Sequence, residues 1–105
     1  MNTKSKTWYG IKDLEKRPGR LTFKDILKST RLSMELSQKS FAKKIGISNA
    51  NLCDIEKGRK GVSPQKAARL AKILGYSIDL WVQTSIQDQL SAAGLHYRVS
   101  LEKSA

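Results

Sequence analysis

Serine and glycine punctuate this chain at spacings that suit a succession of short helices. Serine is a preferred residue just before a helix, because its hydroxyl accepts a hydrogen bond from a free backbone N–H of the first turn. Glycine is preferred just after a helix, because the backbone there often needs a positive φ that glycine adopts without strain. Between these signals, apolar residues recur every three or four positions. The pairs are Ser37 and Gly46, Ser48 and Gly58, Ser63 and Gly75, and Ser77 and Gly94.

These signals, with Thr22 as a further cap, predict five helices, over residues 22–33, 38–45, 49–57, 64–74 and 78–93. After Gly94, apolar and polar residues alternate from Leu95 to Leu101, a period of two that is typical of a strand. A lone strand has no partner for its backbone, so it pairs with a second copy, with another protein, or with nothing. The predicted fold is all-α, with five helices, a short C-terminal β-strand and a basic N-terminal arm.

The charge of the chain is large and unevenly distributed. The 105 residues include 20 Lys+Arg and 9 Asp+Glu, a net charge of +11. Residues 21–75 carry twelve basic and four acidic side chains, a net of +8, whereas residues 76–105 carry two and three, a net of −1. The remaining +4 belongs to residues 1–20, which either form an arm on DNA or are solvated charge. A basic surface suits a polyanion, and nucleic acid is the commonest such partner.

Composition argues against several other classes of protein. One Cys and one His cannot supply an internal disulfide or a zinc site, so no metal or cofactor is expected. No apolar run approaches the roughly 20 residues of a membrane span. Residues 1–12 lack the apolar stretch of a secretory signal, which predicts a cytoplasmic location. Paired carboxylates, a catalytic triad and a phosphate loop are all missing, so an enzyme is not expected.

The second and third predicted helices are joined by the three-residue turn Gly46-Ile47-Ser48. Two short helices around such a turn form a helix-turn-helix, whose second helix enters the DNA major groove. With its caps, glycines and core positions in register, residues 23–80 resemble the lambda-repressor-like family of the Cro and xenobiotic-response-element type. We therefore predict three parts: a basic arm over 1–20, a DNA-binding domain over 21–77, and a dimerisation or partner-binding part over 78–105.

The resemblance implies roles for individual residues. The start of the recognition helix would face base edges, and Asp54 either accepts from cytosine or pairs with Lys57 on the helix surface. Cations after that helix would hold phosphates, as would the start of the preceding helix. Arg31 and Glu56 match a structural ion pair. The base-facing residues are Ser48, Asn49, Ala50, Asn51 and Asp54, and the phosphate-facing residues are Gln38, Lys57, Arg59 and Lys60.

Three positions depart from the family pattern. Glu35 stands after the first helix, where the family usually has glycine or asparagine. The loop from Gly58 to Ser63 is about one residue longer than usual, which shifts the expected phosphate contacts. Ala50 offers a methyl group to a thymine but no hydrogen bond to a base.

The function expected from this resemblance is a sequence-specific repressor that binds an inverted repeat of double-stranded DNA as a homodimer. Short chains of this kind also resemble antitoxins of type II toxin–antitoxin pairs, which bind a toxin and repress their own operon. A phage or host regulator without a toxin looks similar, and a protein-interaction module that keeps the fold but not DNA binding is the alternative from another class. The expected dimer residues are Trp81, Val82, Ile86, Leu90, Tyr97 and Val99.

Overall fold

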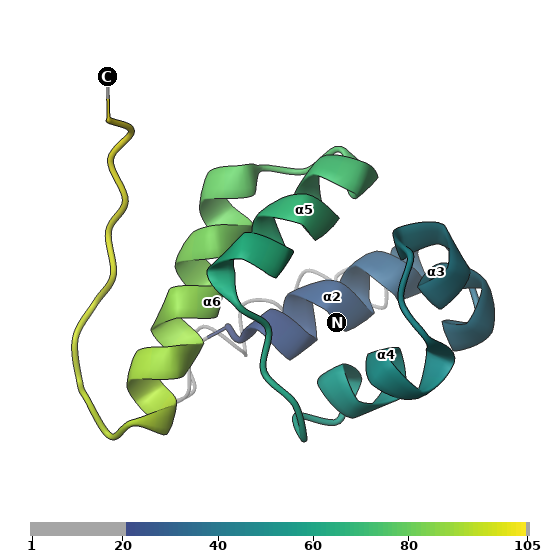
Figure 1. The fold of residues 1–105 in the computed structure, drawn as a ribbon, viewed down its shortest axis with the longest axis horizontal. Coiled ribbons are helices and arrows are strands. Elements are labelled where there is room, and N and C mark those ends of the chain that lie inside the picture. Colours follow the sequence, from purple (N-terminus) through teal and green to yellow (C-terminus); the bar gives the residue numbers. More distant parts are fainter. Residues whose placement is uncertain (1–20, 105) are drawn as a thin grey trace, which may run out of the picture.

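Five α-helices follow one another in the computed structural model, which describes residues 21–104 (Figure 1). Their order matches the prediction, and their bounds match it except at the start of α2 and the ends of α4 and α6, each of which differs by one residue. The expected basic arm, residues 1–20, lies outside the described residues. The helices are α2 (Phe23–Ser33), α3 (Gln38–Ile45), α4 (Asn49–Glu56), α5 (Pro64–Leu74) and α6 (Ile78–Ala92).

The serine caps predicted from the sequence are all present. In α3, α4, α5 and α6, the hydroxyl of the serine before the helix accepts a hydrogen bond from the third backbone N–H of that helix, at 3.0–3.2 Å. Thr22 and Asp25 cap α2 reciprocally, since the Asp25 carboxylate accepts from both the N–H and the hydroxyl of Thr22. Local hydrogen bonds therefore fix where each helix begins.

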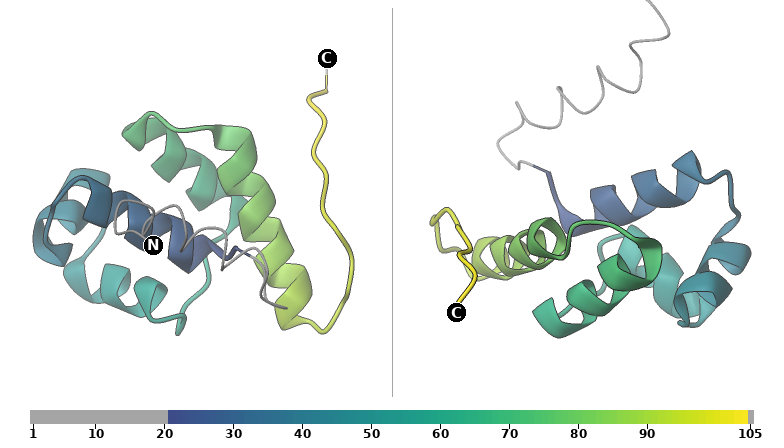
Figure 2. Two further views of the ribbon diagram at one scale, coloured as in Figure 1. Left: turned by 180° about the vertical axis from the view of Figure 1, so that it is seen from behind. Right: turned by 90° about the horizontal axis from the view of Figure 1, so that it is seen from above.

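The five helices, seen from two further sides in Figure 2, enclose one hydrophobic core. Every helix contributes fully buried side chains to it, including Leu27, Phe41, Leu52, Leu70 and Trp81. The indole of Trp81 meets the Phe23 ring edge-on at 5.5 Å and stacks on the Tyr76 ring at 5.8 Å. Among the described residues, no helix is long and apolar enough to cross a membrane.

Helix α6 turns a different face to the core than its apolar stripe indicates. Trp81, Thr84 and Ser85 are its buried residues. Ile78 is 42% exposed, and the rest of the stripe (Val82, Ile86 and Leu90) is half-buried. The stripe therefore lies beside the core and remains in part accessible on the single chain.

The predicted C-terminal β-strand is absent, since residues 21–104 contain no strand. Residues 95–104 are instead an extended segment that runs back beside α6 (Figure 1). The side-chain amide of Gln87 on α6 donates to the Tyr97 carbonyl at 2.6 Å and accepts from the Val99 N–H at 2.9 Å. The physical reason for the failed prediction is that a strand needs a second strand, and the described part of one chain provides none.

Candidate nucleic-acid interface

The turn between α3 and α4 is fixed by backbone hydrogen bonds and by one glycine. Gly46 has a φ of +76°, and the next N–H, that of Ile47, donates to the Ala42 carbonyl at 3.0 Å. Ile47 packs against the core, and Ser48 then caps α4. A left-handed residue, a buried anchor and a cap in succession thus hold α3 and α4 in the helix-turn-helix arrangement that the spacing predicts.

Helix α4 divides cleanly into a buried and an exposed side. Leu52, Ile55 and Glu56 face the core. Ser48, Asn49 and Ala50 are exposed at the start of the helix, as base-reading residues would need to be. The predicted base-facing set also includes Asn51 and Asp54, which are half-buried.

Asn51 differs from its neighbours on α4 in its surroundings. Its side-chain carbonyl oxygen is buried and has no hydrogen-bond partner among the described residues. Asn51 therefore differs from the exposed residues Ser48, Asn49 and Ala50 in that part of its side chain lies within the fold.

An ion pair ties α2 to α4 directly beneath this surface. The Arg31 guanidinium donates to both carboxylate oxygens of Glu56, at 2.8 and 3.1 Å, and to the Leu36 carbonyl at 3.0 Å. The Gln38 amide donates to the same carboxylate at 2.9 Å. The start of α3 is thereby joined to the pair through one of the two N–H groups of the Gln38 side-chain amide.

The pKa of the Glu56 carboxyl lies below its usual value. Burial alone raises this pKa, because it disfavours the charged form. The hydrogen bonds from Arg31 and Gln38, with the positive charges of Arg31 and Lys28, outweigh that effect. Glu56 is therefore a carboxylate at neutral pH, and it lies on the buried side of α4.

Cations surround the recognition helix on the adjoining elements. Lys57, Arg59 and Lys60 are exposed in the loop after α4. Arg59 lies 3.6 Å from the Asp54 carboxylate, and its backbone N–H donates to the Asp54 carbonyl at 2.9 Å. Asp54 thus pairs with Arg59, a partner that the sequence did not indicate, and not with Lys57. Helix α3 adds exposed lysines that were also not predicted, namely Lys39, Lys43 and Lys44.

The loop after α4 is fastened to the opposite side of the fold. Its Val62 is buried, and the Val62 carbonyl accepts from the Ser85 hydroxyl of α6 at 2.6 Å. Ser85 is itself 1% exposed. This bond fixes the end of the loop from which Arg59 and Lys60 project, and no local motif in the sequence could have revealed it.

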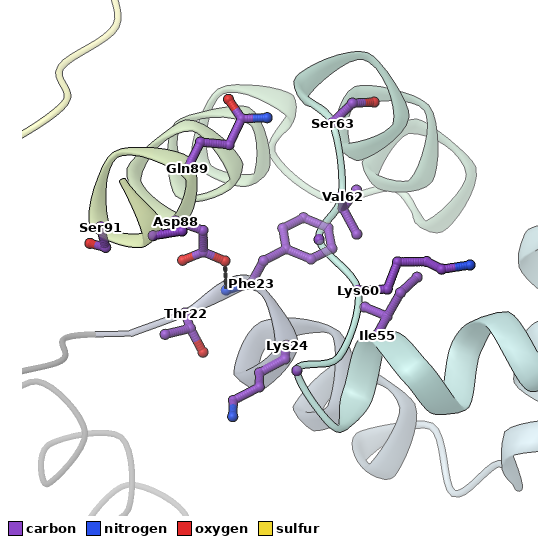
Figure 3. A pocket seen from close by; sticks show the side chains of 13 residues that line it. Thr22, Phe23, Lys24, Ile55, Lys60, Val62, Ser63, Asp88, Gln89 and Ser91 are labelled. Carbon is purple, nitrogen blue, oxygen red and sulfur yellow. Dashed lines mark hydrogen bonds between the residues drawn. The ribbon is translucent and has the colours of Figure 1, made fainter. Parts of the chain in front are cut away.

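A hollow of about 570 Å³ lies between this loop, the start of α2 and the end of α6. Its lining is mostly apolar. Figure 3 shows Asp88 pointing from α6 to the start of α2, where its carboxylate accepts from the Phe23 N–H at 3.0 Å. The hollow was not foreseen, because its walls come from segments far apart in the sequence.

The residues expected at a dimer interface fall into two groups. Tyr97 is 67% exposed, and Val82, Ile86, Leu90 and Val99 are half-buried, so all five offer surface to a partner. Trp81 does not, because it is 1% exposed within the single chain. The indole belongs to the core, and its neighbours on α6 carry the accessible surface.

One comparison with known proteins bears on this surface. A family model described as Helix-turn-helix matches residues 27–81, which are 55 of the 105 residues. The matched stretch includes α3, the turn, α4 and the cationic loop. No curated protein matches the chain. The chain belongs to this helix-turn-helix family of DNA-binding regulators.

Proposed function

We propose that the chain is a sequence-specific transcriptional repressor that binds double-stranded DNA as a homodimer. The observation that carries this proposal is the exposed start of α4, Ser48–Ala50, with cations on both adjoining elements. Asn49 there can bond adenine through two hydrogen bonds, and Ala50 can contact a thymine methyl. Lys57, Arg59 and Lys60 would hold phosphates, which sets register and affinity without reading sequence.

A homodimer suits sequence-specific binding, because a single recognition helix contacts few bases and two helices contact twice as many. Two-fold symmetry would place two copies of α4 in successive major grooves, about 34 Å apart on an inverted repeat. The partly accessible stripe of α6 (Val82, Ile86 and Leu90) and the extended segment with Tyr97 and Val99 are the surface we assign to the second copy. Both lie in the near-neutral part of the chain, where repulsion between copies is small.

We further propose that the repressor is the antitoxin of a type II pair and regulates its own operon. A second apolar surface near the start of α6 supports a protein partner in addition to DNA. Its members, which are all large and at least 42% exposed, are Ile73, Tyr76, Ile78 and Leu80. A toxin encoded in the adjoining frame would bind there. Expression of that frame alone would arrest growth, and co-expression of this chain would relieve the arrest.

The experiment that tests the DNA-binding proposal is selection from a random pool of duplex DNA at low and near-physiological salt. Recovery of an inverted repeat with half-sites one helical turn apart supports a dimeric repressor that reads sequence. Salt-sensitive binding without a consensus contradicts sequence reading by this chain alone. Failure to bind at either salt concentration overturns the proposal and favours a protein-interaction module.

A further inference from the structure

The side chain of Gln87 takes the place of a neighbouring strand for the C-terminal segment. It donates to the Tyr97 carbonyl and accepts from the Val99 N–H. In an extended chain, the N–H and C=O groups of residues i and i+2 point to the same side. A neighbouring strand would therefore bond the Tyr97 carbonyl and the Val99 N–H, as Gln87 does. One amide on α6 thus bonds two backbone groups on one edge of the segment.

The other edge of this segment is free. In an extended chain the backbone groups of His96, Arg98 and Ser100 lie on the side opposite to those of Tyr97 and Val99. They make no hydrogen bond with the described residues. Beside this edge the apolar side chains of Leu95, Tyr97 and Leu101 are 40–67% exposed. An open edge with one apolar face pairs readily with another strand.

We propose that this free edge pairs with the same edge of a second copy, as an antiparallel ribbon in which Val99 faces Val99. The inference rests on the homodimer of the proposed function and specifies how it forms. Each Arg98 would exchange two backbone hydrogen bonds with Ser100 of the other copy, and Tyr97 would face Leu101. Gln87 is then a positioning residue, because it prepares each segment before the copies meet.

Side-chain chemistry selects this register from the alternatives. Residues on one strand face residues of the same parity on the other, so a two-fold axis near the middle of the segment passes through residue 97, 98, 99 or 100. An axis at Ser100 sets Arg98 opposite Glu102 but places Tyr97 opposite Lys103, which interrupts the apolar face. An axis at Arg98 sets two arginines directly opposite each other, which is unfavourable. An axis at Tyr97 sets His96 opposite Arg98 and leaves Glu102 unused.

The axis at Val99 keeps the apolar face continuous and still brings Glu102 near Arg98. It pairs residues 96–102 with their counterparts, and it sets Glu102 opposite His96 and diagonal to Arg98, within reach of the arginine side chain. On the other face it brings Val99, Tyr97 and Leu101 into one apolar cluster. The segment is therefore complementary to itself, which is the reason to assign it to a second copy and not to a different protein.

Disulfide trapping tests the register directly. Val99→Cys, in a chain that also carries Cys53→Ser, should form a covalent dimer under mild oxidation, because residues facing each other without backbone hydrogen bonds have Cα atoms about 4.5 Å apart. Arg98→Cys in the same background is the matched control, since its Cα would lie about 7 Å or more from its counterpart. We expect the Val99 variant to cross-link at least about tenfold faster. Equal rates, or faster cross-linking of Arg98→Cys or Tyr97→Cys, would overturn the proposal.

A proline exchange tests the backbone pairing without a new thiol. Arg98→Pro removes the N–H that points to the second copy, whereas Arg98→Ala keeps it. The mass of the chain in solution, by light scattering at low micromolar concentration, should shift to monomer for Arg98→Pro and stay dimeric for Arg98→Ala. A monomeric unmodified chain, or two variants of equal mass, contradicts the inference.

Both tests are performed without DNA, so they separate this inference from the function on which it rests. If selection recovers an inverted repeat while Arg98→Pro leaves the dimer intact, the repressor stands and the ribbon fails. If Val99→Cys cross-links selectively while no DNA is bound, the ribbon stands and the DNA-binding proposal fails.

Discussion

Arg31 on α2 places its guanidinium nitrogen Nε 2.8 Å from the Glu56 carboxylate on α4, with the two side chains 12% and 3% exposed. The pair joins the first helix to the buried side of the recognition helix. Gln38 extends the network to the start of α3. Three helices that surround the proposed DNA surface are thus connected through one carboxylate, so its ionisation should affect the stability of the whole unit.

Acid should destabilise the fold through Glu56. The pKa of this carboxyl is lowered on folding from its usual value of 4.5. Between the two pKa values the unfolded chain binds more protons, so the contribution of Glu56 is fully present above a pH of about 4.5 and is lost as the pH falls through the folded pKa. Urea unfolding as a function of pH should show this loss in the unmodified chain and a flatter profile in Glu56→Gln. Glu35→Gln, which removes an exposed carboxylate, is the control and should keep the acid sensitivity.

Replacing Glu35 by glycine should stabilise the protein. Glu35 lies in the turn directly after α2 with a φ of +58°, a left-handed conformation that costs a residue with a Cβ about 1–2 kcal/mol. Glycine removes this strain but loses more backbone entropy on folding, about 0.5–1 kcal/mol. We expect a net gain of about 0.5–1 kcal/mol in the free energy of unfolding, measured by urea denaturation.

Gly46→Ala is the converse control for this effect. Gly46 has a φ of +76°, and a Cβ built there meets nothing within 4 Å. If Gly46→Ala lowers the free energy of unfolding, the cause is therefore the strained backbone conformation and not a steric clash. A stabilised Gly46→Ala, or a destabilised Glu35→Gly, would contradict the assignment of strain to these two turns.

Ser85→Ala should loosen the loop that carries the phosphate-facing cations. The exchange leaves the buried Val62 carbonyl without its 2.6 Å donor, which costs roughly 1–3 kcal/mol. Thr84→Ala is the matched control, because the Thr84 hydroxyl bonds only to the Leu80 carbonyl of its own helix. Hydrogen exchange in residues 57–63 should accelerate in Ser85→Ala and not in Thr84→Ala. Equal protection in both variants would show that Ser85 does not fasten the loop.

The sequence predicted those parts of the fold and site that local interactions determine. Each serine cap bonds to an N–H three residues away, so its effect is visible in a short window, and the helix bounds followed from it. The ion pair of Arg31 with Glu56 was foreseen by resemblance. The link from Ser85 to Val62 was not, because 23 residues separate the two and neither belongs to a motif.

Two expectations failed because the spacing of apolar residues shows that a helix or strand has an apolar face, but not which neighbour that face contacts. The apolar stripe of α6 was assigned to a dimer interface together with Trp81, but the sequence did not show that Trp81 would instead take the core face with Ser85. The alternation after Gly94 correctly indicated an extended segment. A strand also requires a second strand to pair with. Within the described residues, the segment bonds to the Gln87 side chain instead.

Arg59 and Asp54 should have opposite effects on DNA affinity. Arg59→Ala should weaken binding to every sequence and reduce the salt slope by about 0.9, because one phosphate contact is lost. Asp54→Ala frees Arg59 from the carboxylate 3.6 Å away and removes a negative charge, so it should strengthen binding to unrelated DNA. Titration of a random duplex at several salt concentrations measures both effects. If Asp54→Ala weakens binding to unrelated DNA, Asp54 does not restrain Arg59.

Asn49 should determine which sequence is bound and contribute little to affinity for unrelated DNA. It is exposed at the start of α4 and its side chain makes no hydrogen bond with the described residues, so its amide is available to a base edge. Asn49→Ala should weaken binding to the selected site by about 1–3 kcal/mol while leaving binding to random duplex and the salt slope unchanged. Gln65→Ala, an exposed polar residue on α5, is the control and should change neither. If Asn49→Ala changed only the unfolding midpoint, α4 would not read base sequence, because loss of a base contact reduces discrimination between sequences without reducing fold stability.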